Sequence, residues 1–211
     1  GLWSNKDTWV GNVLPVPGND ILIPAGSVVA LDGVITSFNN VTVSGTLQGS
    51  NGASGTANSL TINGDLTINP GGAYKAFTTG GFGVATSLGG NYTNNGYANH
   101  VLGSIRFNGG VTVANSTVIS GTGVFEGTTS EGIINSITLA TTGTSNAINT
   151  PQNIVSYNMN ALAGSLNTNG KYRIDNTARF NGRPLNTQLW SVNVSNMGAG
   201  YTAAPFIAGS S

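Results

Sequence analysis

Few residues of this chain could carry acid–base or metal chemistry. His100 is the single histidine and there is no cysteine, so a Cys-His pair or a typical zinc site lacks its ligands. Because His100 lies in a Gly/Asn-rich stretch, we expect its ring to be solvated. Glu126 and Glu131 are close enough in sequence to face each other as a glycosidase pair must. Acids beside a turn are more often solvated, so we predict no catalytic residue and no enzyme; a polysaccharide lyase or glycosidase is the residual alternative.

Three aspartates raise the question of calcium. Asp20, Asp32 and Asp65 could stack at adjacent corners of a repetitive fold, and Ca²⁺ takes six to eight oxygen ligands. Neither an EF-hand loop nor the repeated glycine-aspartate calcium signature occurs in the sequence. Aspartate in turns commonly hydrogen-bonds nearby backbone. We therefore expect no cofactor, with Ca²⁺ the one metal left open.

A basic group near the C-terminal end is the candidate ligand site. Alternation along a strand would place Lys171 and Arg173 on one face, where they could grip an anionic glycan, and Tyr172 on the other. The alternative, which we favour, is a charged edge that discourages strand pairing. The candidate residues are Lys171, Tyr172, Arg173, Arg179 and Arg183.

The composition predicts strands and turns to position these residues. Only 7% of residues are charged, against roughly 25% in an ordinary domain. There are 32 glycines, while 38% of residues are hydrophobic, so a core can form. The net charge of zero argues against a nucleic-acid partner. No apolar run approaches the roughly 18 residues of a spanning helix, so we expect no membrane insertion.

Internal repeats predict an all-β solenoid. The segments VTVSGTL at 41–47 and LTINGDL at 60–66 lie 19 positions apart, and a similar pair begins at Ile21. Residues 60–74 match residues 111–125 at a spacing of 51. A period near 20 indicates a parallel β-helix whose coils cover one another, with a β-sandwich as the alternative. The threonines expected on its outer face are Thr42, Thr61, Thr67, Thr112 and Thr138.

Two segments break this rhythm. Residues 75–110 are glycine-rich and predict a widened coil or a loop excursion. Residues 149–190 are more mixed and suggest a terminal cap. We therefore divide the chain into coils with an N-terminal tryptophan cap at 1–148, and terminal coils, cap and a C-terminal connecting strand at 149–211.

Three pieces of sequence resemble known surface proteins. Trp3 and Trp9, with PVPGND at 15–20, IPAG at 23–26 and VALD at 29–32, resemble the opening of G8-like β-helix modules of bacterial surface proteins. GGNYTNNG at 89–96 and GSIRFNG at 103–109 resemble a repeat of secreted Bacteroidota proteins, and GAGYTAAP at 198–205 a motif of bacterial and phage surface proteins. The resemblance implies a pectate-lyase-like right-handed β-helix displayed outside the cell. No catalytic cluster of such a lyase is recognisable, so no active site is carried over.

We therefore expect a secreted or cell-surface structural or adhesive protein. Its partners would be further copies of itself, or neighbouring surface domains, joined by strand addition at open ends. The segment 192–207 is the candidate connecting strand. The alternative is a glycan-binding module or a polysaccharide-processing β-helix. Trp3 and Trp9 could form a carbohydrate-stacking platform, but this close to a terminus we expect them to seal the first coil. The candidate assembly residues are Trp3, Trp9, Val192, Val194, Tyr201, Phe206 and Ile207.

Overall fold

The computed structural model describes residues 1–49, 58–76, 83–108, 117–140, 146–162, 166–169 and 171–180. This part of the chain is built from strands, with two short 3₁₀ helices, η1 (Lys6–Thr8) and η2 (Val10–Asn12), near the N-terminus. Neither helix has the length or apolarity to cross a bilayer. Arg183 and the segment 192–207, with Val192, Val194, Tyr201, Phe206 and Ile207, lie outside the described residues.

The strands form two sheets. The first has seven strands, in the order β1 (Ile21–Ile23), β4 (Val41–Val43), β7 (Leu66–Ile68), β10 (Tyr92–Asn94), β12 (Val118–Ser120), β15 (Asn146–Asn149) and β17 (Leu166–Asn167). The second has eleven: β2 (Val28–Leu31), β3 (Val34–Phe38), β5 (Thr46–Gly49), β6 (Ser59–Ile62), β8 (Ala73–Lys75), β9 (Ala85–Leu88), β11 (Tyr97–Phe107), β13 (Val124–Phe125), β14 (Glu131–Leu139), β16 (Asn153–Ala161) and β18 (Tyr172–Phe180).

The second sheet bends at β11. The beginning of β11 pairs with β8, where Tyr97 lies opposite Ala73, and its end pairs with β9, where Phe107 lies opposite Leu88. The rows β2-β5-β8 and β3-β6-β9 therefore merge into one curled sheet at this strand. The sheets also continue past residue 148, because β16 and β18 extend the row of β14.

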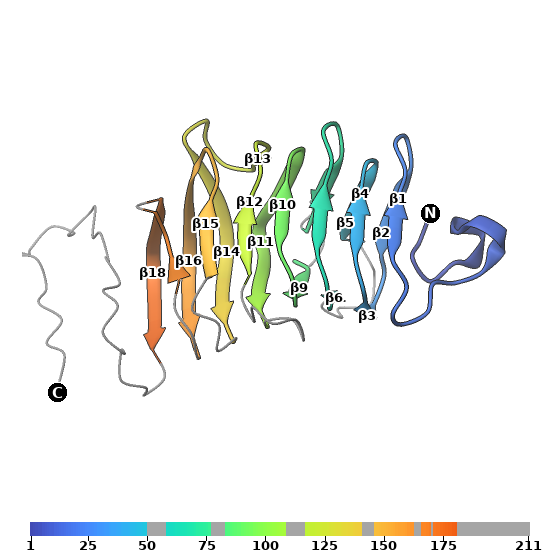
Figure 1. The fold of residues 1–211 in the computed structure, drawn as a ribbon, viewed down its shortest axis with the longest axis horizontal. Coiled ribbons are helices and arrows are strands. Elements are labelled where there is room, and N and C mark those ends of the chain that lie inside the picture. Colours follow the sequence, from blue (N-terminus) through green and yellow to red (C-terminus); the bar gives the residue numbers. More distant parts are fainter. Residues whose placement is uncertain are drawn as a thin grey trace, which may run out of the picture.

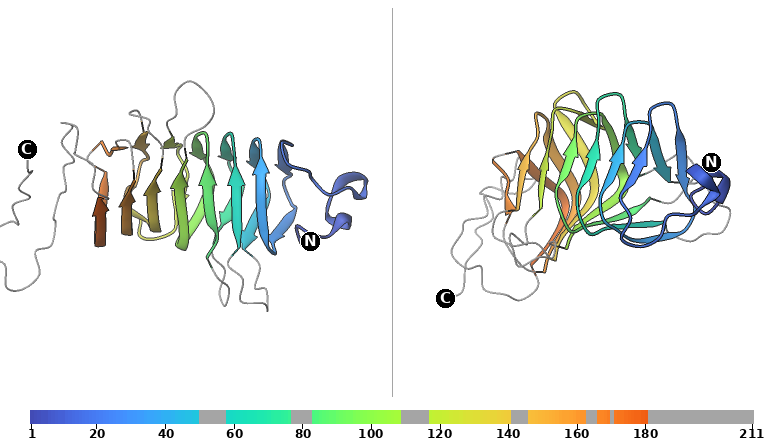
Figure 2. Two further views of the ribbon diagram at one scale, coloured as in Figure 1. Left: turned by 90° about the horizontal axis from the view of Figure 1, so that it is seen from below. Right: turned by 45° about the vertical axis from the view of Figure 1, so that its right-hand side comes forward.

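Every pairing between two described strands is parallel. The partner strand comes from the next pass, by which we mean the next circuit of the chain through the two sheets. In the first sheet, Ile21 pairs with Val41, Val41 with Leu66, Leu66 with Tyr92, and Tyr92 with Ile119. Figures 1 and 2 show successive passes side by side along the long axis in chain order. The antiparallel pairing that a β-sandwich needs is not seen between these strands.

Alternating side chains explain why these short segments become strands. Val41 and Val43 of β4 are fully buried, while Thr42 between them points outward. The same pattern repeats in β7 and β5. The inward residues of both sheets form one continuous core, which runs from Trp3 to Leu166. Parallel stacking thus removes the apolar side of each pass from water.

The register differs from the one that the sequence repeats suggest. Thr42 pairs with Thr67, whereas Thr61 belongs to β6 in the other sheet, so the spacing of 19 joins non-equivalent strands. In the match at 51, Tyr74 and Phe125 do share a column through Ala98. For Thr67 the same match is wrong by two residues. It gives Val118 as the equivalent position, whereas Thr67 pairs with Thr93 and Thr93 pairs with Ser120.

The outward threonines therefore form no single ladder. Thr42 and Thr67 lie on the first sheet, and Thr61 and Thr138 on the second, while Thr112 lies outside the described residues. Of the segment 75–110, for which a widened coil or a loop excursion was predicted, residues 83–108 form the strands β9, β10 and β11, and the pairing of β11 with β14 shifts register between His100 and Ser104.

One corner of the stack is lined by glycine because successive passes touch there. Gly45, Gly72, Gly96 and Gly123 stand just before β5, β8, β11 and β13. A Cβ atom at Gly96 would lie 2.3 Å from the carbonyl oxygen of Gly72, and one at Gly123 would lie 2.4 Å from that of Gly96. Since real Cβ contacts do not come so close, only glycine fits.

A second corner is held by side-chain acceptors. Asp20 Oδ1 accepts a hydrogen bond from the backbone N–H of Asn40, and Asn40 Oδ1 from that of Asp65. Asp65 Oδ1 in turn accepts from Asn91 N–H at 2.7 Å, and Asn91 Oδ1 from Val118 N–H. Each pass thus caps the next one at the entry to the first sheet. We call Asp20, Asn40, Asp65 and Asn91 the polar ladder.

Residues before β1 cover much of the N-terminal end of the stack. Trp3 N–H donates to the carbonyl oxygen of Ala30, and the Trp3 ring is 4% exposed against Phe38. Trp9 packs edge-on against Trp3 and donates from its indole nitrogen to Trp3 O. The tryptophan pair therefore closes the first pass.

Candidate functional site

The basic group on β18 is occupied by partners within the chain. Lys171 Nζ donates to the carbonyl oxygen of Thr150 at 2.7 Å. Arg173 bridges Glu131 and Asp175, with nitrogen–oxygen distances of 2.5 and 2.7 Å. The hydrogen bond to Asp175, followed by that to Glu131, raises the pKa of Arg173. Lys171 and Arg173 therefore each contact an earlier part of the chain, Thr150 and Glu131 respectively.

Tyr172 faces the opposite way from Lys171 and Arg173, against the core. Its hydroxyl lies 2.6 Å from Ser156 Oγ and 3.2 Å from Met159 Sδ. Burial raises the pKa of Tyr172 above its ordinary value. Arg179 belongs to β18, but its side chain is not among those that the structure describes. Of the five predicted ligand residues, the structure describes the side chains of Lys171, Tyr172 and Arg173, and Tyr172 lies on the opposite face from the other two.

Each of the two glutamates has a hydrogen-bond partner of its own within the chain. Glu126 accepts a hydrogen bond from the Tyr97 hydroxyl, and Glu131 is engaged by Arg173. Asp20 and Asp65 belong to the polar ladder, and Asp32 accepts from Ser4 N–H. No group of three potential metal ligands occurs among the described residues.

His100 is fully buried, so the expectation of a solvated ring is wrong. Its Nε2 lies 3.0 Å from the Tyr92 hydroxyl, and its ring packs edge-on against Tyr74 and Tyr92 and near Phe125. Burial lowers the pKa of His100 to about 3. The alternation Ala98-Asn99-His100 in a strand carried this signal, because it places His100 on the inward face with Ala98.

Exposed apolar side chains gather at the N-terminal end. Seven of the ten large exposed hydrophobic residues in the described part precede residue 29. They belong to the cap and the first two strands, at the blue end of Figure 1. We call this set the N-terminal face: Leu2, Val10, Val13, Leu14, Val16, Leu22 and Val28.

The N-terminal face includes an open strand edge. β1 pairs only with β4 among the described strands. Ile21 N–H donates to Asn40 O and Ile23 O accepts from Ser44 N–H. Leu22, between them, therefore directs its own backbone groups away from β4, to the side where no described strand lies. Sequence reasoning missed this face, although its run of valines and prolines at 10–17 was visible.

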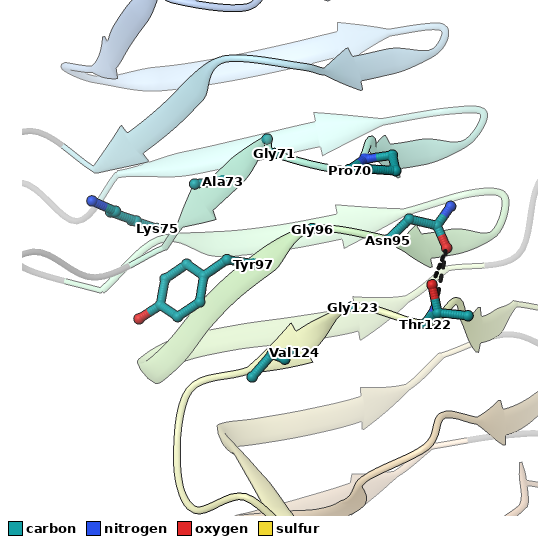
Figure 3. A pocket seen from close by; sticks show the side chains of 11 residues that line it. Pro70, Gly71, Ala73, Lys75, Asn95, Gly96, Tyr97, Thr122, Gly123 and Val124 are labelled. Atoms are coloured by element: carbon teal, nitrogen blue, oxygen red, sulfur yellow. Dashed lines mark hydrogen bonds between the residues drawn. The ribbon is translucent and has the colours of Figure 1, made fainter.

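A shallow, open groove lies beside the glycine corner. It has a volume of about 640 Å³ and crosses three successive passes, at the starts of β8, β11 and β13. Figure 3 shows Lys75 and Tyr97 on one side of its glycine floor, and Asn95 and Thr122 on the other. None of these residues was predicted as part of a site from the sequence. The lining is completed by Pro70, Gly71, Gly72, Ala73, Gly96, Gly123 and Val124.

Comparison with known proteins assigns no family or activity: no family model, curated protein or solved structure matches the chain.

Proposed function

We propose that this chain is a non-catalytic structural or adhesive protein of the extracellular surface, built as a right-handed parallel β-helix that assembles end to end. The parallel stacking of successive passes supports the helix. Its hand follows from the strong preference of parallel strand crossovers for right-handed connections. The extracellular location rests on the resemblance to surface proteins and on the low charge of 7%.

The open β1 edge within the N-terminal face is the observation that carries the assembly. An unpaired parallel edge accepts a further strand, and a contact between unlike ends repeats into a filament unless the rotation closes it. The occupant we propose is the C-terminal end of a second copy, with residues 192–207 as the added strand. That segment carries no charged residue, and neither does the run at 10–18 on the N-terminal face.

A favourable free energy of association requires both apolar burial and strand pairing. Covering a half-exposed leucine or valine is worth on the order of 1 kcal/mol, so the seven residues together set an upper bound of several kcal/mol on the apolar contribution. Association itself costs roughly 4–15 kcal/mol. Apolar contact alone therefore gives weak binding, and the backbone hydrogen bonds of the added strand must supply the rest.

Sedimentation velocity and negative-stain electron microscopy of the 211-residue chain test the assembly. We expect concentration-dependent filaments for the parent chain, and loss of them on Leu22→Lys or on deletion of residues 192–211. Leu102→Lys is the matched control, because Leu102 is 50% exposed but lies on β11 in the middle of the stack. A monomeric parent chain, or Leu22→Lys filaments equal to those of Leu102→Lys, would contradict the proposal.

A further inference from the structure

We propose that the groove beside the glycine corner binds an extended chain of uncharged hexoses. This site goes beyond the assembly proposed above and uses none of its residues. Four features of the groove favour such a ligand: its shape, an aromatic wall, a polar wall, and the balance of charge between Lys75 and Glu126.

The groove runs along the stack and is long enough for a chain ligand. It is lined by residues of three adjacent passes, which begin β8, β11 and β13. Adjacent strands lie about 4.8 Å apart, so the three passes span roughly 10 Å, or roughly two linked hexoses. Gly72, Gly96 and Gly123 all line it, and Figure 3 shows Gly96 and Gly123 between its two walls, where they carry no side chain that could block the path.

Tyr97 supplies an oriented aromatic wall. Its hydroxyl donates a hydrogen bond to Glu126 on the next pass, which fixes where the ring stands. Burial, and then this bond to the Glu126 carboxylate, raises the pKa of Tyr97 to about 12, so the hydroxyl stays a donor at neutral pH. Val124, which is 52% exposed, continues the apolar surface beside it. A fixed ring flanked by an aliphatic side chain suits the C–H face of a sugar.

Asn95 and Thr122 form a polar wall across the floor. Thr122 N–H donates to Asn95 Oδ1 at 3.1 Å, and the Thr122 hydroxyl lies 3.4 Å from the same oxygen. The amide NH₂ of Asn95 is not used within the described residues, so it can donate to a ligand. Sugar hydroxyls both donate and accept, which matches an amide beside a hydroxyl.

The charges around the groove favour a neutral ligand over an acidic one. Lys75 is the one charged residue of the lining and makes no ion pair within the described part of the chain. It pairs in register with Asn99, while Glu126 directly follows β13, and the Glu126 N–H donates to Ala98 O. The Lys75 ammonium and the Glu126 carboxylate thus belong to the same outer face, formed by β8, β11 and β13. A polyanion would meet Glu126, whereas neutral hydroxyls can accept from Lys75 without that repulsion.

Titration calorimetry and NMR of the parent chain with cellohexaose, laminarihexaose and hexagalacturonate test the site. We expect at least one neutral hexamer to bind more tightly than hexagalacturonate. Tyr97→Ala should raise the Kd of that neutral hexamer at least tenfold, and Lys75→Met should also raise it. Tyr157→Ala is the matched control, because Tyr157 is 49% exposed on β16, and it should leave Kd within twofold.

Three results would overturn the inference: no binding of either neutral hexamer at millimolar concentration, tighter binding of hexagalacturonate, or equal effects of Tyr97→Ala and Tyr157→Ala. Repeating the titration on the Leu22→Lys variant distinguishes a failure of sugar binding from a failure of the proposed assembly. The groove should bind with the same Kd whether or not filaments form.

Discussion

Replacing Gly96 by alanine should force two passes of the chain apart. The added Cβ atom would lie 2.3 Å from Gly72 O, 2.6 Å from Asn69 O and 2.9 Å from Ile68 Cγ2. Ordinary contacts of this kind begin near 3.4 Å, so the backbone must move by about 1 Å. The displaced atom, Gly72 O, also accepts the hydrogen bond from Tyr97 N–H at 3.0 Å.

The cost follows from these two effects. Overpacking of this size costs about 1–3 kcal/mol, and weakening a backbone hydrogen bond adds about 1 kcal/mol. The lower entropy of an unfolded alanine returns about 0.4–1 kcal/mol. We therefore expect Gly96→Ala to lower the free energy of unfolding by about 2–3 kcal/mol, a large part of the 5–15 kcal/mol of a typical domain.

Urea unfolding, followed by far-UV circular dichroism and by tryptophan fluorescence, measures the effect. Gly33→Ala is the matched control, because nothing lies within 4 Å of its added Cβ and its φ is not in the left-handed region. That variant should be neutral or up to about 1 kcal/mol more stable. If Gly96→Ala unfolds within about 0.5 kcal/mol of the parent chain, the close contact at this corner is refuted.

Three further predictions concern polar groups of the stack. Asp65→Ala should cost about 1 kcal/mol in urea unfolding because Asn91 N–H loses its acceptor, whereas Asp65→Asn keeps Oδ1 and should stay within about 0.5 kcal/mol. His100 is held neutral by a pKa of about 3, below the 6.5 of an unfolded histidine. The stability it contributes is present above pH 6.5 and falls as the pH drops, by about 2 kcal/mol at pH 5, and His100→Gln should remove this slope in pH-dependent unfolding. Arg173→Ala should cost under about 1 kcal/mol, and less in high salt, because its ion pairs are about one-third exposed; a larger loss would show that this bridge matters more than surface pairs do.

The class of structure could be predicted from the sequence. Apolar-Thr-apolar triplets such as 41–43 predict short strands with one buried face, and the structure confirms an all-β chain with parallel strands. The register could not be predicted, because the passes differ in length. Val41 follows its partner Ile21 by 20 residues, and Leu66 follows Val41 by 25. Triplets in different rows, such as 60–62 and 66–68, look alike, so a fixed period matches the wrong strands.

The candidate sites were harder to predict than the fold. The groove exists because Gly72, Gly96 and Gly123 from three passes meet at one corner, and in the sequence they are three glycines among 32. Tyr97 and Lys75 become neighbours only through the parallel register of β8 and β11. Arg173, by contrast, was visible in the sequence, but its partner Glu131 lies 42 residues away and could not be assigned.

Disulfide formation between engineered cysteines tests the stacking register most directly, because the chain has no cysteine of its own. Thr42 and Thr67 are paired residues of adjacent parallel strands, at a separation of about 4.8 Å that a disulfide can span. The stacked arrangement predicts that the variant with cysteines at 42 and 67 forms an intramolecular disulfide under mild oxidation, measured by mass spectrometry. The variant with cysteines at 42 and 61 should stay reduced, since Thr61 belongs to the other sheet. Cross-linking of 42 to 61, or none in either variant, would contradict the account.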